Sequence, residues 1–104
     1  MVLDLTVFNQ ETFDIKFSET ETLHIKKADE ELAIKLVAYS MDSADTDIKD
    51  VINNVNILIK EILNHNTDNK KFTKADIDKM QFNVKIEILR QYTEFIYNIQ
   101  NNPN

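Results

Sequence analysis

The stretch FDIKFSETETLHIKKADEELAIKL, residues 13–36, contains the change of pattern that decides the fold. Up to Ile25 the apolar residues recur at every second position, which is the period of a β-strand with one buried face. After Lys27 they recur every three or four positions, which is the period of an α-helix. The stretch therefore predicts an α+β fold in which the strands come first and the helices follow.

The strands are expected to form a three-stranded antiparallel meander over residues 1–26. Residues 3–7, 13–17 and 22–26 alternate between apolar and polar side chains, and the polar stretches 9–11 and 18–21 separate them as turns. One face of such a sheet must pack on another element. The residues expected on this core face are Leu5, Val7, Phe13, Ile15, Phe17, Leu23 and Ile25.

Three helices are expected in the second part of the chain, residues 28–100. Asp29 can cap a first helix that runs to about residue 41, and Thr46 can cap a second over about 47–64. Thr73 and Asp76 have the spacing of a capping box, which predicts a third helix over about 74–100. No internal repeat or linker interrupts the chain, so we expect one domain over residues 1–104.

The second helix has the clearest amphipathic pattern. Its apolar side chains occupy one arc, and only Ile57 lies outside it. This pattern predicts a core helix. The residues of the arc are Ile48, Val51, Ile52, Val55, Leu58, Ile59, Ile62 and Leu63.

The third helix carries more apolar residues than one buried face needs. One stripe, expected to be internal, consists of Ile77, Met80, Val84, Ile88, Tyr92, Phe95 and Ile99. A second stripe, expected to bind a protein partner or a second copy, consists of Phe82, Ile86, Leu89, Ile96 and Tyr97. A helix over 74–100 would be about 40 Å long, more than a domain of this size easily covers. The alternative is a central helix that the sheet and the second helix bury on both sides.

Composition excludes several classes of function. The 104 residues carry 18 acidic and 12 basic side chains, a formal charge of −6, which disfavours nucleic-acid binding. There is no cysteine for disulfides or thiolate chemistry, and no glycine for a phosphate-binding loop. No signal peptide or membrane span is visible, so we expect a cytoplasmic protein without membrane contact.

No group of residues has the pattern of a catalytic, cofactor or metal site. His24 and His65 are isolated, and neither has a second ligand at zinc-site spacing. The carboxylates near residues 42–50 lack the glycine and the terminal glutamate of a calcium loop. Ser18, Ser40 and Ser43 stand in no motif with a base. We therefore expect a protein that is not an enzyme and needs no cofactor.

The order of elements resembles a known family. The N-terminal LTVFNQETFDIKFSETETLHIK, followed directly by KADEELAIKLVAYS and two further helices, resembles the tail assembly chaperones of long-tailed (siphovirus-type) phages. The abundance of Ile, Asn and Lys fits a phage of low-GC Gram-positive bacteria. The resemblance covers most of the chain in outline and includes no specific motif.

The resemblance implies a non-enzymatic protein that binds the tape measure protein, or another tail protein, as an oligomer in the host cytoplasm. It transfers no catalytic residue. The alternative function is a small acidic phage or prophage regulator or inhibitor that mimics nucleic-acid charge. A charge mimic would bind through its acidic face and be sensitive to salt, whereas a chaperone would bind through apolar side chains.

Overall fold

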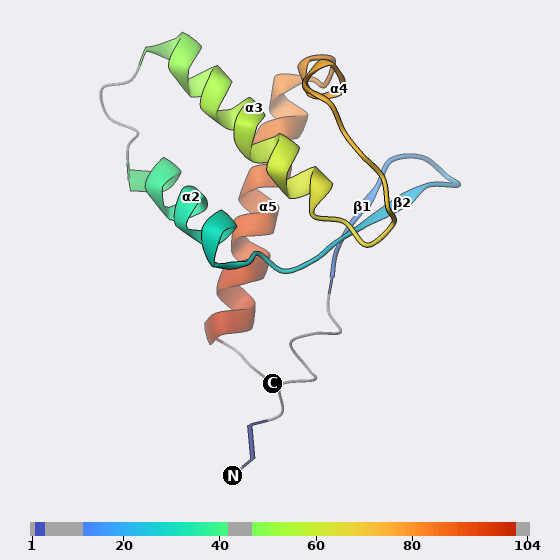
Figure 1. The fold of residues 1–104 in the computed structure, drawn as a ribbon, viewed down its shortest axis with the longest axis vertical. Helices are drawn as coiled ribbons and strands as arrows, with labels where there is room; N and C mark the ends of the chain where they lie inside the picture. The colour runs from blue at the N-terminus through green and yellow to red at the C-terminus, as the bar shows by residue number, and fades with distance from the viewer. Residues whose placement is uncertain (1, 4–11, 42–46, 102–104) are drawn as a thin grey trace.

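The computed structural model describes residues 2–3, 12–41 and 47–101 (Figure 1). Strand β1 (Phe13–Lys16) and strand β2 (Thr22–Ile25) form a two-stranded antiparallel sheet. Phe13 pairs with Ile25 and Lys16 pairs with Thr22. Residues 18–21 form the turn between the strands, as predicted from their polar composition. The chain is thus an α+β fold in the predicted order, strands before helices.

The helices are α2 (Glu30–Met41), α3 (Ile48–Asn64), α4 (Lys74–Asp78) and α5 (Phe82–Asn101). Asp29 caps α2 as predicted, because its Oδ1 accepts the backbone N–H of Leu32 at 2.9 Å. The cap of α3 is Asp47, not Thr46 as expected. Asp47 is closer to the first amphipathic turn, and its carboxylate suits the positive end of the helix dipole.

Helix α3 lies at the centre of the fold and contacts α2, α4, α5 and β2 (Figure 1). The side chains that α3 contributes to the core all belong to the apolar arc predicted from its periodicity. The core side chains are Leu23, Ile25, Leu32, Leu36, Val55, Leu58, Ile59, Ile62, Leu63, Ile77, Ile88, Leu89 and Tyr92. The sheet covers one side of this cluster through the buried side chains of β2.

The three-stranded meander is confirmed only for its second and third strands. Residues 4–11, which include most of the expected first strand with Leu5 and Val7, lie outside the described residues. Leu3 is described and is 70% exposed. Phe17 was expected in the core but is 41% exposed, because the chain leaves β1 there and Phe17 stacks on Phe72 beside the turn.

The single helix predicted over 74–100 is wrong: α4 and α5 are separate. The capping box of Thr73 and Asp76 is confirmed, but the helix that it starts ends at Asp78. Met80 N–H then bonds to the carbonyl of Ile77, and α5 begins at Phe82. The break lets α4 bury Ile77 against α3 while α5 takes a different course. The periodicity of the sequence did not predict this break, because the apolar residues keep helical spacing across residues 79–81.

Candidate protein-binding surface

The stripe expected to bind a partner does not form one exposed face of α5. Leu89 is buried and belongs to the core, while Ile86 and Ile96 are half-buried and pack against it. Phe82 is 45% exposed. Tyr97 lies near the end of α5, where only the backbone is described. The binding role of these residues stays a prediction, and of those with described side chains Phe82 is the most exposed.

The stripe expected to be internal is also divided. Ile88 and Tyr92 are buried, but Val84 is 42% exposed. The reason is geometrical: at 100° per residue the buried side chains of both stripes fall in one arc centred between them. The two stripes are therefore halves of one broad face. The length argument for a second face also fails, because α5 has 20 residues and spans only about 30 Å.

Tyr92 anchors the middle of this broad face. Its side chain is fully buried, and its hydroxyl donates a hydrogen bond to the carbonyl oxygen of Lys26 at 2.7 Å. Its ring meets Phe13 edge-on at 5.6 Å and stacks on Phe95 at 6.2 Å. Burial, with a smaller contribution from the charge of Asp29, raises the pKa of the phenol well above its ordinary value. The contacts fix α5 against the sheet.

Lys85 is a buried cation that the sequence patterns did not single out. The residue is 4% exposed, and its Nζ donates to Oδ1 of Asn56 on α3 at 2.6 Å. The bond places the first turn of α5 beside the middle of α3. A buried ammonium needs such an acceptor, since desolvation otherwise costs several kcal/mol. The sequence indicated this burial in part, because Lys85 lies between apolar residues on the side of α5 that faces the core.

The apolar face of α3 continues beyond the residues that cover it. Val55 is fully buried, Ile52 is 40% exposed and Ile48 is 70% exposed. The latter two belong to the arc that was predicted to be core, so this part of the prediction is wrong. Residues spaced by four lie on the same side of a helix. The core of the domain therefore ends one turn before the apolar face of α3 does.

Two exposed apolar side chains, Phe82 and Val84, belong to the first turn of α5. Phe82 and Val84 precede Lys85 by three residues and one residue, and Lys85 is bonded to Asn56, one turn from Ile52. We refer to Ile48 and Ile52 as the apolar end of α3. Isolated exposed apolar residues are common on proteins. Phe82 and Val84, two residues apart, point to nearly opposite sides of α5, whereas Ile48 and Ile52 share one side of α3 and form the candidate contact surface.

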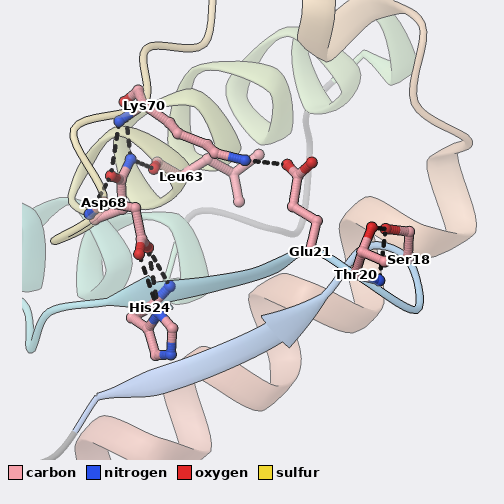
Figure 2. Close-up of polar contacts among 8 residues, drawn as sticks. Ser18, Thr20, Glu21, His24, Leu63, Asp68 and Lys70 are labelled. Atoms are coloured by element: carbon pink, nitrogen blue, oxygen red, sulfur yellow. Dashed lines mark hydrogen bonds and ion pairs between the residues drawn. The ribbon is translucent and has the colours of Figure 1, made fainter.

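The histidines are engaged in structural contacts. In Figure 2, Asp68 points at His24: one carboxylate oxygen accepts the backbone N–H of His24 at 2.7 Å, and the other lies 3.1 Å from Nδ1. These bonds, the backbone N–H bond first, lower the pKa of Asp68 below its ordinary value. The Nε2 of His65 lies 2.9 Å from the carbonyl oxygen of Lys27. Both histidines thus fix the loop after α3 to the sheet.

The loop after α3 is built from asparagine where other proteins often use glycine. Asn66 Oδ1 accepts the backbone N–H groups of Asp68 and Lys70, and its Nδ2 donates to the carbonyls of Leu63 and Lys70. Asn69 has a φ of 59°, the left-handed region that asparagine tolerates. Lys70 also forms an ion pair with Glu21 beside the turn of the sheet (Figure 2). These contacts hold the loop after α3 against the sheet.

A shallow groove of about 450 Å³ lies between α2 and α3. Its walls carry charges of both signs, with Lys35 held to Glu61 at 2.5 Å and Lys60 nearby. Hydrogen bonds to Glu61 raise the pKa of Lys35. Leu32 and Ile57 supply its apolar part. No nucleophile–base pair stands in it, so the groove offers no evident chemistry.

The part of the chain that the structure describes contains no cluster of three or more residues able to hold a metal ion. Within the same ranges, no helix combines the length and apolar character needed to cross a membrane. Comparison of the chain with protein-family models, with curated proteins and with solved structures finds no match.

Proposed function

We propose that this chain is a non-enzymatic assembly chaperone of the kind that serves tail morphogenesis in long-tailed phages, and that it binds the tape measure protein in the host cytoplasm. The observation that carries the proposal is the apolar end of α3. There Ile48 and Ile52 continue the core-facing arc of α3 into solvent. A partner that covers them would extend the existing core.

The spacing of these side chains suits a helical partner. Two aliphatic side chains one turn apart on α3 form a ridge, and an amphipathic helix can lay its apolar face against such a ridge. A long, mostly helical protein offers many such faces. The resemblance of the element order to tail assembly chaperones supports the tape measure protein as that partner.

The acidic charge is less suited to be the binding determinant. Several carboxylates have partners within the chain: Glu61 binds Lys35, and both Glu87 and Glu94 bind Arg90. Hydrogen bonds from Arg90 and Gln91 lower the pKa of Glu87 to about 2. These carboxylates are ionised, but each has its charge offset by a neighbouring cation, which leaves less unbalanced negative charge on this surface. This favours the chaperone over the charge-mimicking regulator.

The test is co-purification of the chain with the tape measure protein of the same phage genome, encoded by the long helical-protein gene expected downstream. We expect Ile48→Asp and Ile52→Asp to lose the complex while circular dichroism shows an intact fold. Ile57→Asp is the matched control, because Ile57 is also a half-exposed isoleucine of α3 but lies opposite the apolar arc. It should retain the complex.

Salt separates the two candidate functions. An apolar contact should persist between about 0.1 M and about 1 M salt, whereas a charge mimic should lose affinity steeply as the Debye length shortens. Binding that is unaffected by the α3 substitutions and disappears in high salt would reject the chaperone proposal and favour the regulator.

A further inference from the structure

We propose that the outer edge of β1 is a self-association site, where β1 of a second copy adds to the sheet as an antiparallel strand. The two sheets would then join into one sheet that contains both β1 strands at its centre. This proposal concerns the strand edge and does not depend on the function proposed above, which rests on α3.

The two edges of the sheet differ. The edge of β2 that faces away from β1 is already hydrogen-bonded to the loop after α3. Lys26 N–H donates to the carbonyl of His65, and Thr67 N–H donates to the carbonyl of His24. The carboxylate of Asp68 accepts the N–H of His24. Figure 2 shows this loop on one side of β2 and β1 on the other. Among residues 2–3, 12–41 and 47–101, β2 is the only strand paired with β1.

The hydrogen-bonding pattern shows which backbone groups of β1 point outward. Phe17 N–H bonds to the carbonyl of Glu21, and the backbone of His24 bonds to the loop on the far side of β2. In an antiparallel pair the bonded positions alternate. Phe13 and Ile15 therefore direct their backbone groups to β2, and Asp14 and Lys16 direct theirs away from it. These outward groups of β1 can form hydrogen bonds with another strand.

This alternation limits how a second β1 can pair. The outward residues must bond to outward residues, so Asp14 can face Asp14, Lys16 or Ser18 of a second copy, and each choice sets the whole register. The register that places Asp14 opposite Lys16 of the second copy has its twofold axis at Ile15. The neighbouring registers oppose Asp14 to Asp14 or Lys16 to Lys16, and like charges directly opposite destabilise a sheet.

The favoured register also matches the apolar face. With the axis at Ile15, Ile15 meets its own copy and Phe13 meets Phe17 of the second copy. Phe17 is 41% exposed and Phe13 and Ile15 are half-buried in the single chain. Asp14 and Lys16 are exposed on the other face. The segment FDIKF is thus self-complementary in charge and in hydrophobicity about one axis. This complementarity selects a second copy as the occupant of the edge.

The experiment is a charge exchange read by light scattering over a concentration series. The unaltered chain should approach the mass of two 12.2 kDa chains. Asp14→Lys and Lys16→Asp should each weaken the dimer about tenfold or more, because each change creates two like-charge pairs about the axis. Asp14→Lys with Lys16→Asp should restore it, because the exchange recreates both opposite-charge pairs. Circular dichroism checks that every variant is folded.

A cysteine variant tests the register without charge changes. The chain has no native cysteine, so Ile15→Cys should give a disulfide-linked dimer on mild oxidation, since the axis brings each Cβ to about 4.5–5.5 Å from its copy. Thr20→Cys, in the exposed turn, is the matched control and should give no disulfide-linked dimer.

Several results would overturn the proposal. One is a chain that stays monomeric, the result expected if residues 3–7 of the same chain pair with β1. Others are a dimer insensitive to both single charge changes, a double exchange that fails to restore the dimer, and crosslinking of the two cysteine variants at equal rates.

Discussion

Removal of the Tyr92 hydroxyl tests whether α5 is fixed to the sheet as the contacts indicate. Tyr92→Phe keeps the ring against Phe13 and Phe95 and removes only the 2.7 Å hydrogen bond to the carbonyl of Lys26. A hydrogen bond of this kind contributes about 0.5–1.5 kcal/mol net. We therefore expect the free energy of unfolding to fall by about 1 kcal/mol, which lowers the melting temperature by about 4–8 °C in a chain of this size.

Tyr92→Ala separates the ring from the hydroxyl. It also removes the buried ring and leaves a cavity, at a cost of about 3–5 kcal/mol. The assay is urea unfolding followed by circular dichroism, with thermal melting as a second measure. Tyr39→Phe is the matched control, because Tyr39 is half-buried and its hydroxyl has no hydrogen-bond partner among the described residues. Equal stability of Tyr92→Phe and the unaltered chain, or a loss as large as that of Tyr92→Ala, would refute the reasoning.

Three further outcomes are expected. Lys85→Met should change the unfolding free energy by less than about 1 kcal/mol, whereas Asn56→Leu should cost about 1–3 kcal/mol because it leaves the buried ammonium without its acceptor; similar losses in urea melts of both variants would contradict this. Asp68 has a folded-state pKa below its ordinary value, so its stabilisation exists above about pH 4 and is lost as pH falls through the folded pKa. Asp68→Asn should therefore be less stable than the unaltered chain above about pH 4, and the difference in unfolding free energy should narrow as pH falls through the folded pKa. A constant difference would argue against the contact of Asp68 with His24. Ile57→Ala should alter thermal stability by no more than about 0.5 kcal/mol, and a larger loss would mean that α3 is covered on both sides.

The order of elements could be read from the sequence because it depends on local periodicity. The alternation through Phe13, Ile15, Leu23 and Ile25 identified both described strands, and residues 30–41 and 48–64 are helical close to where the spacing placed them. The capping box at Thr73 was also correct. These features follow from short-range steric and hydrogen-bonding rules that a single segment already satisfies.

The candidate contact surface was only partly available from the sequence. Excess apolar surface was expected, and Phe82 is exposed as predicted, but the sequence placed the boundary of the buried face between two stripes that pack as one. Ile48 and Ile52 have the same periodicity as Val55. Only the position of the neighbouring helices decides that the core stops before them.

Tertiary structure alone decided where α5 begins, which residues close the edge of β2 and how a buried lysine is satisfied. The apolar pattern stays in phase across residues 79–81, so the break between α4 and α5 arises from what each helix packs on. Asp68 meets His24, and Lys85 meets Asn56, across 44 and 29 residues of sequence. The sequence by itself determined the type and order of the elements, since those depend on neighbours along the chain. Which side chains are buried, paired or left for a partner depends on neighbours in space.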